Sequence, residues 1–173
     1  GVVVACPQHA SSYSPATMLH DASGAYFAYL PYYFGDGILH LDDAQTRAWF
    51  KDATLYHAPP AWAMGNAVAL DGNGGLVVLE DNTLRLRHLS ASGTQDWGDP
   101  ANGLTLATGP SAGVDLVADG NGGVWAAWMA GGGSRLQHLL ADGTVAPGWG
   151  PSGRLVANTM YPTLAGDGTG GVL

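Results

Sequence analysis

The sequence predicts an all-β fold built from repeated units of four antiparallel strands, and three observations support this. The pattern Asp-Gly-x-Gly-Gly begins at residues 71, 119 and 167, an interval of 48 residues each time. Between these turns lie short runs rich in Val, Leu and Trp, bounded by Gly, Asp, Asn and Pro, a pattern typical of strands. Gly accounts for 27 of the 173 residues, and only 12% of residues are charged. Such a composition suits tight turns and leaves few residues for exposed helix faces.

The repeat extends well beyond the glycine-rich turn. A degenerate copy of the turn begins at Asp21, 50 residues before Asp71. A His-Leu pair follows each of the first three turns after 17 to 19 residues, and a Trp follows each His after 9 to 11 residues. Fixed positions separated by small length changes are typical of hairpins whose loops vary. The His residues are His40, His88 and His138, and the Trp residues are Trp49, Trp97 and Trp149.

The clearest copy predicts four strands in order. They are Val114–Ala118, Val124–Met129, Arg135–Ala141 and Arg154–Asn158. The turn at residues 119–123 joins the first two, because Gly supplies positive φ there and the Asp side chain can accept hydrogen bonds from the amides of the turn. Four strands in about 48 residues match one blade of a β-propeller.

The repeats divide the chain into units 16–65, 66–113 and 114–161, with partial blades at 1–15 and 162–173. Residues 1–173 are therefore expected to form one incomplete propeller domain of about three and a half blades, whereas rings have about four to eight. We expect a fragment of a larger ring. Its open flanks would expose apolar faces or unpaired strands, so missing blades or a second copy of the chain are the expected partners.

The order Asp-Gly-x-Gly-Gly, strand, Leu-x-His-Leu-x-x-x-Gly-Thr, then Trp-Gly resembles the repeats of secreted bacterial β-propeller proteins. The resemblance spans nearly the whole chain. It implies a ring architecture and a secreted or cell-surface location in a bacterium. It implies no particular activity.

The repeated Asp and His residues could in principle form two kinds of metal site, but a structural role explains them better. Each Asp-Gly-x-Gly-Gly turn offers a single carboxylate, whereas calcium takes about six to eight oxygen ligands. The repeated His residues fall on third strands, towards the rim of a propeller, where a hydrogen bond to a neighbouring strand would meet the same need in every unit. We therefore predict no metal and no other cofactor. The structural repeat anchors are Asp71, Asp119, Asp167, His88, His138, Trp97 and Trp149.

Aromatic residues are distributed unevenly, with eleven of the sixteen lying within residues 1–65. Several fall where a loop between the second and third strands is expected, which favours contact with a sugar, a peptide or a partner protein. Packing against a neighbouring blade is the alternative interpretation. The candidate ligand-binding residues are Tyr32, Tyr33, Phe34, Trp49 and Trp62.

Charge and motifs limit the function classes. A net charge of −8 argues against nucleic-acid binding, and no apolar run reaches the roughly 18 residues of a membrane span. Cys6, the single cysteine, permits no disulfide within the chain, and a buried or partner-linked thiol is expected. No serine-hydrolase or phosphate-binding motif occurs. The sequence therefore predicts a non-catalytic extracellular binding or structural module that contacts a protein or glycan surface. The alternative is part of an extracellular carbohydrate-active enzyme whose catalytic residues lie outside this chain.

Overall fold

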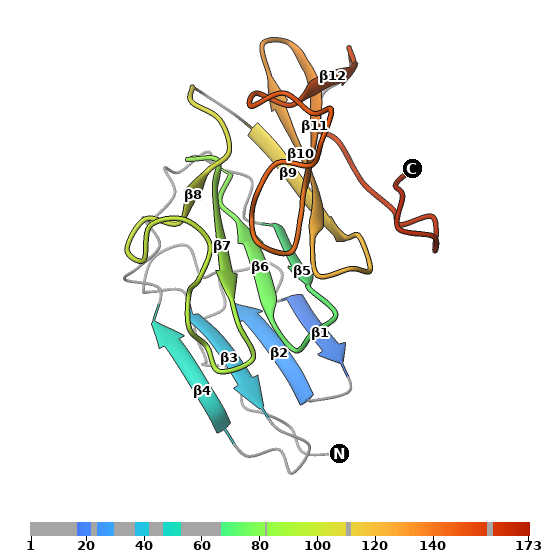
Figure 1. The fold of residues 1–173 in the computed structure, drawn as a ribbon. Helices are drawn as coiled ribbons and strands as arrows, with labels where there is room; N and C mark the ends of the chain where they lie inside the picture. The colour runs from blue at the N-terminus through green and yellow to red at the C-terminus, as the bar shows by residue number, and fades with distance from the viewer. Residues whose placement is uncertain are drawn as a thin grey trace.

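The chain folds into antiparallel β-sheets of four strands each, as the sequence predicts (Figure 1). The computed structural model describes residues 17–21, 24–29, 37–41, 47–52, 67–81, 83–109, 112–158 and 161–173. Over these ranges there are three such sheets and no helix. Each sheet takes four strands that follow one another in the sequence, so every connection joins neighbouring strands.

The first sheet contains β1 (Thr17–Asp21), β2 (Gly24–Tyr29), β3 (Gly37–Leu41) and β4 (Arg47–Asp52). Their backbones pair in the order β1-β2-β3-β4. The register shifts once, between the third and fourth strands near His40.

The second sheet contains β5 (Ala67–Leu70), β6 (Leu76–Leu79), β7 (Arg85–Leu89) and β8 (Leu104–Thr105). All four residues of β6 are buried, so this strand is covered on both faces. A continuous apolar run with no polar alternation is what a strand covered on both faces requires.

The third sheet contains β9 (Ala112–Ala118), β10 (Val124–Ala130), β11 (Gly133–Leu139) and β12 (Arg154–Ala157). The expected turn at residues 130–134 is tighter than predicted. Two glycines with φ of 64° and 83°, at positions 131 and 132, make a two-residue loop of the kind that joins twisted antiparallel strands. The third strand accordingly begins and ends two residues earlier than predicted.

Residues 161–173, which include the partial blade expected at 162–173, contain a short antiparallel hairpin. Gly166 bridges Val172, and Ala165 and Leu173 exchange two backbone hydrogen bonds. The hairpin pairs through one isolated bridge rather than through continuous strands. Its turn carries the third copy of the repeated sequence pattern, beginning at Asp167.

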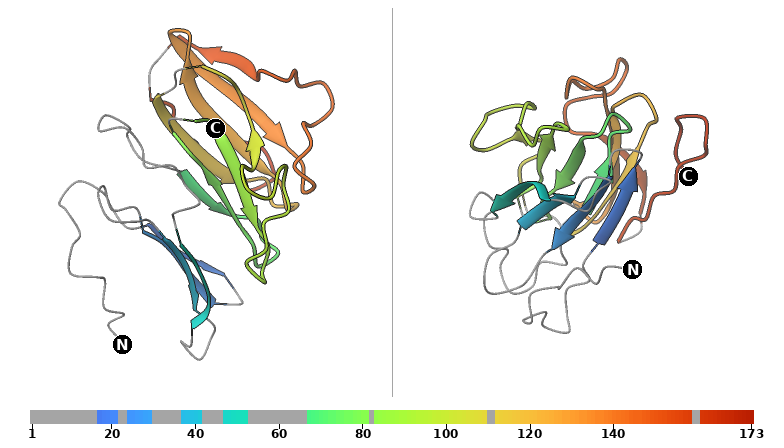
Figure 2. Two further views of the ribbon diagram at one scale, coloured as in Figure 1. Left: turned by 90° about the vertical axis from the view of Figure 1, so that its left-hand side faces the viewer. Right: turned by 90° about the horizontal axis from the view of Figure 1, so that it is seen from below.

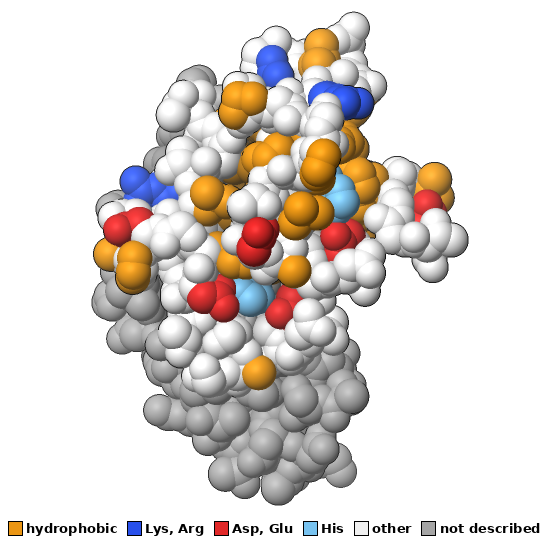
Figure 3. Space-filling view, viewed as in Figure 1, with side chains coloured by type: hydrophobic (Ala, Val, Ile, Leu, Met, Phe, Trp, Pro, Cys, Tyr) orange, Lys and Arg blue, Asp and Glu red, His pale blue; other side chains and the backbone are white. Residues whose placement is uncertain are grey.

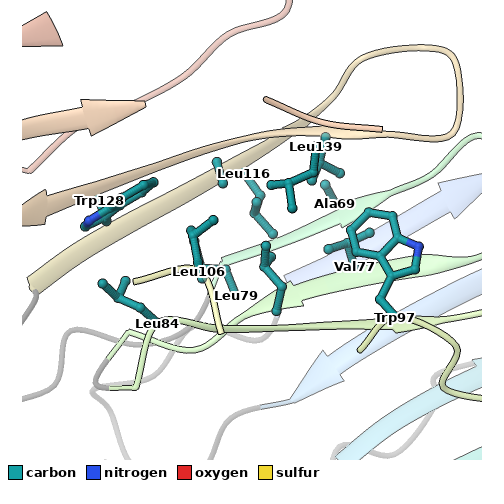
Figure 4. Close-up of a cluster of buried hydrophobic side chains, with 12 residues drawn as sticks. Ala69, Val77, Leu79, Leu84, Trp97, Leu106, Leu116, Trp128 and Leu139 are labelled. Atoms are coloured by element: carbon teal, nitrogen blue, oxygen red, sulfur yellow. The ribbon is translucent and has the colours of Figure 1, made fainter. Parts of the chain in front are cut away.

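The sheets lie face to face, one after another along the chain (Figure 2). The larger buried apolar cluster lies between the second and third sheets, where side chains from both interlock (Figure 4). A smaller cluster lies on the opposite face of the second sheet and includes Leu19 of the first sheet at its margin. The larger cluster consists of Ala69, Val77, Leu79, Leu84, Leu86, Trp97, Leu106, Leu116, Val124, Ala126, Trp128 and Leu139.

Candidate functional site

The turn that begins at Asp119 is held by its own carboxylate. Asp119 Oδ1 accepts hydrogen bonds from the backbone N–H groups of Asn121, at 2.8 Å, and Gly123, at 2.9 Å. The chain must reverse within a few residues here, and the carboxylate satisfies amides that the turn would otherwise leave unpaired. The turns at Asp71 and Asp167 have the same two bonds, from Asn73 and Gly75 and from Thr169 and Gly171.

The other carboxylate oxygen of Asp119 reaches across the sheet. His138 Nε2 lies 2.9 Å from Asp119 Oδ2, although the end of β9 and the strand β11 are separated by β10. In the second sheet His88 Nε2 lies 2.9 Å from Asp71 Oδ2. Figure 3 shows the described His side chains beside acidic side chains on one face of the molecule.

The last glycine of each turn leaves room for this crossing. A Cβ at Gly123 would lie 2.2 Å from the carbonyl oxygen of Leu139 and 2.6 Å from Asp119 Oδ2. A Cβ at Gly75 would lie 2.4 Å from Asp71 Oδ2. The glycine before it is required for its backbone conformation instead. Gly122 adopts a φ of 89°, a left-handed conformation that glycine adopts without strain.

Hydrogen bonds decide the charge state of Asp119. Burial by itself would raise the pKa of this carboxyl, but the bonds from His138 and from the amides of Asn121 and Gly123 outweigh it and lower the pKa below its usual range. The side chain is 4% exposed, so an ionised Asp119 depends on these donors.

A tryptophan covers the imidazole in the second sheet. The ring of Trp97 stacks on His88 with centroids 4.8 Å apart and planes inclined by 24°. Its Nε1–H donates to the carbonyl oxygen of Ala141 at 3.0 Å, and Ala141 belongs to the third unit. Because Trp97 is only 2% exposed, it joins the two sheets from within their shared core.

A different tryptophan has this position in the third sheet. Trp125 of β10 stacks on His138 with centroids 4.0 Å apart and planes inclined by 11°, and its Nε1–H donates to Gly170 O at 2.9 Å. Trp149, the sequence counterpart of Trp97, makes a T-shaped contact with Trp125, with ring centroids 5.3 Å apart, and has the guanidinium of Arg154 over its ring at 4.6 Å.

Sequence reasoning missed Trp125. Its backbone pairs with His138, as that of Val77 pairs with His88, so the two residues occupy equivalent positions on their strands. The available signal was the longer His-to-Trp interval in the third unit, 11 residues instead of 9. Such an interval leaves the face of His138 open to a different ring.

In the second sheet, both nitrogens of the imidazole are hydrogen-bonded to carboxylates. His88 Nδ1 bonds a carboxylate oxygen of Asp96, while its Nε2 bonds Asp71. The position equivalent to Asp96 in the third unit is Ala146, whose amide donates to the carbonyl oxygen of His138 as the amide of Asp96 does to that of His88.

A buried ion pair stands next to this group. Arg87 Nε lies 2.9 Å from Glu80 Oε1, and the two side chains are 1% and 3% exposed. Arg87 also donates to the carbonyl oxygen of Ala101 at 2.8 Å and to Gln95 Oε1 at 3.2 Å. Through these bonds Arg87 links Glu80, in the turn between β6 and β7, to the loop that follows β7.

Of the candidate ligand-binding residues, Tyr32, Tyr33, Phe34 and Trp62 lie outside the described residues, as does Cys6. Trp49 lies in β4, where its backbone pairs with His40 of β3. The structure therefore brings together the Asp, His and Trp anchors of the second sheet, and the Asp and His anchors of the third. Within the described ranges, no group of three or more His, Cys, Asp and Glu residues is arranged to hold a metal ion.

The anchors hold the turns and join neighbouring units. Both imidazoles are covered by a stacked indole, and each bonds the carboxylate of the turn at its Nε2. This geometry fastens a turn to the third strand of the same sheet, and the tryptophan on each imidazole to the next unit.

No protein-family model matches the sequence, and no curated protein matches it. In the part of the chain that the structure describes, no helix is long and apolar enough to cross a membrane.

Proposed function

We propose that the chain is a β-propeller-type repeat module that acts outside the cell in binding or scaffolding rather than in catalysis. The observation that carries the proposal is that each of the two imidazoles is covered by a tryptophan that bonds the following part of the chain. Trp97, from the loop after β7, donates to the backbone of the third unit, and Trp125, from β10, donates to the backbone of residues 161–173.

The turns of successive units also approach one another in the same order. A Cβ at Gly122 would lie 2.8 Å from Asn73 Nδ2, and a Cβ at Gly170 would lie 3.7 Å from Asn121 Nδ2. Each turn thus places its amide side chain beside the glycine of the next turn. A regular step of this kind is what blades arranged around an axis require.

A non-catalytic role is supported by the use of the ionisable residues in this part of the chain. The hydrogen bonds that hold the turns in place use Asp71, Asp119, His88 and His138. Arg87 belongs to a buried ion pair. The extracellular location and the bacterial source rest on the resemblance to secreted propeller repeats. The partner class, a protein or glycan surface, rests on the aromatic residues concentrated within residues 1–65.

The alternative is a carbohydrate-active enzyme to which this chain contributes only part. The same aromatic residues favour it, since aromatic faces stack on sugar rings. We rank it second because the repeated Asp and His residues, the most regular ionisable groups, are engaged in structure.

Two measurements on the purified protein test the proposal. Small-angle X-ray scattering separates blades set around an axis, which form a curved wedge, from a straight stack, which forms a rod. A glycan array run beside a screen for glycoside hydrolysis separates the two functions. A curved particle that binds without turnover supports the module. A rod contradicts the propeller, and turnover favours the enzyme.

A further inference from the structure

One face of the third sheet is equivalent to a face of the second sheet that is already covered. The second sheet presents Val77, Leu86, His88 and Leu106 to the third sheet, and these side chains are between 0% and 6% exposed. This covered face is part of the main core.

The equivalent residues of the third sheet are Trp125, Leu136, His138 and Val156, and we call their surface the outward face. Strand register establishes the equivalence of the first and third positions, because Trp125 pairs with His138 as Val77 pairs with His88. Leu136 and Leu86 each lie two residues before the His, and Val156 and Leu106 each lie three residues after a glycine, at positions 153 and 103. The first three side chains are half-buried, and Val156 is 55% exposed where Leu106 is 4% exposed.

Residues 161–173 already occupy one edge of the outward face. Trp125 donates to the carbonyl oxygen of Gly170, and the amide of Leu164 donates to Asp115 Oδ2 at 2.7 Å. A Cβ at Gly166 would lie 3.6 Å from a methyl group of Val117. The short hairpin thus lies against β9 and the start of β10, as β9 itself lies against β5.

Asp167 in this hairpin has the same arrangement as the two turns that bind an imidazole. Its Oδ1 accepts from the amides of Thr169 and Gly171, and its Oδ2 would lie 2.3 Å from a Cβ at Gly171. The carboxylate therefore crosses over its glycine towards the position of a third strand. Among the described residues, no hydrogen bond to Asp167 Oδ2 is found, whereas the equivalent oxygen of Asp119 bonds His138.

We propose that the outward face binds a further β-sheet of the same repeat pattern, whose His-bearing strand pairs with residues 171–173 and donates an imidazole N–H to Asp167 Oδ2. The register follows from the third sheet, where Val124 pairs with Leu139 and Trp125 with His138. In the docked sheet, a Leu would face Val172 and the His would face Leu173. The inference rests on the proposed function in one respect, namely that the added sheet has the same repeated sequence pattern.

The test is the full chain extended after Leu173 by a second copy of residues 126–158, so that Leu173 takes the position of Trp125 in the new unit. Hydrogen exchange followed by mass spectrometry reports on β12, where Leu155 and Val156 are 56% and 55% exposed. We expect amide exchange at residues 154–157 to slow by about tenfold or more, because docking covers an exposed edge strand.

Asp167→Asn in the extended chain removes the carboxylate that receives the imidazole, and should return most of that protection. Asp142→Asn is the matched control. Asp142 Oδ1 also accepts hydrogen bonds from a Thr two residues later, but its turn is exposed and bonds no imidazole. This control should leave the protection unchanged.

Each other outcome overturns the inference. Equal exchange in the original and extended chains means that the outward face does not bind a sheet of this pattern. Equal effects of Asp167→Asn and Asp142→Asn mean that Asp167 is not the receptor of the imidazole. Protection in the unextended chain that rises with protein concentration identifies a second copy as the occupant. Failure here leaves the scattering and turnover results of the proposed function unaffected, so the two can be told apart.

Discussion

Asp119 is ionised in a place where burial alone would favour the neutral acid. The hydrogen bonds that lower its pKa below 3.8 in the folded chain are absent when the chain unfolds, so the ionised group stabilises the fold above its unfolded pKa. This contribution disappears as the pH falls through the lowered pKa of the folded state. We expect the free energy of unfolding in urea to fall as the pH drops below about 4, and to fall less steeply in Asp119→Asn. Val145→Ala, at a position 37% exposed, should retain the wild-type slope, and an unchanged slope in Asp119→Asn would contradict the assignment.

The glycine beside this carboxylate is needed for space. Gly123→Ala would place a methyl group 2.2 Å from a backbone oxygen, so either β10 moves or the bond between Asp119 and His138 breaks. We expect a loss of about 1–3 kcal/mol in the free energy of unfolding, measured in denaturant. Gly150→Ala, where a Cβ meets nothing within 4 Å, should change it by less than about 0.5 kcal/mol. Equal losses in the two variants would show that the crossing carboxylate does not set the need for glycine.

At the scale of the elements, two tryptophans that match in the sequence have different surroundings. Trp97 is buried between two sheets, whereas Trp149 is half-buried and contacts a ring edge and a guanidinium. Trp97→Ala should therefore cost about 3–5 kcal/mol in stability, as expected for a buried indole. Trp149→Ala should cost about 1–2 kcal/mol, because it removes only an edge contact and a cation–π contact. Thermal unfolding followed by circular dichroism compares the two variants. Equal decreases in the midpoint temperature would contradict the prediction that the buried Trp97 contributes more to stability than Trp149.

The strands were predictable because their signals are local. Runs such as Val124–Met129 are apolar and bounded by Gly and Asp, and the strand observed there, Val124–Ala130, differs by one residue. In the third sheet Trp125, rather than the sequence-matched Trp149, stacks on the imidazole, and the same reasoning could not predict this. It depends on which ring reaches His138 after a loop lengthens, and that is a matter of three-dimensional contact. The Asp71–His88 bond was predictable in part. The repeated Asp-to-His spacing indicates that the two residues share a role, but only the structure shows that the carboxylate passes over Gly75 to reach the imidazole.

At the scale of the whole molecule, one core is shared by two sheets. Trp128 of β10 is fully buried and lies in the same cluster as Leu84 and Leu106 of the second unit (Figure 4). Repeat proteins draw much of their stability from such interfaces, so a cavity in one unit weakens its neighbour. Sheets that share a core are expected to unfold together rather than one at a time.

Trp128→Ala tests this coupling. The substitution removes a large side chain from the third sheet, and we expect amide exchange to accelerate in β6 as well as in β10, since side chains of both strands belong to the same buried cluster. Leu76→Ala is the matched control, because Leu76 belongs to the smaller cluster on the other face of the second sheet. That change should accelerate exchange in β6 and affect β10 less. If Trp128→Ala accelerates exchange only within residues 112–157, the two sheets are independent units, and the shared cluster contributes little to their cooperativity.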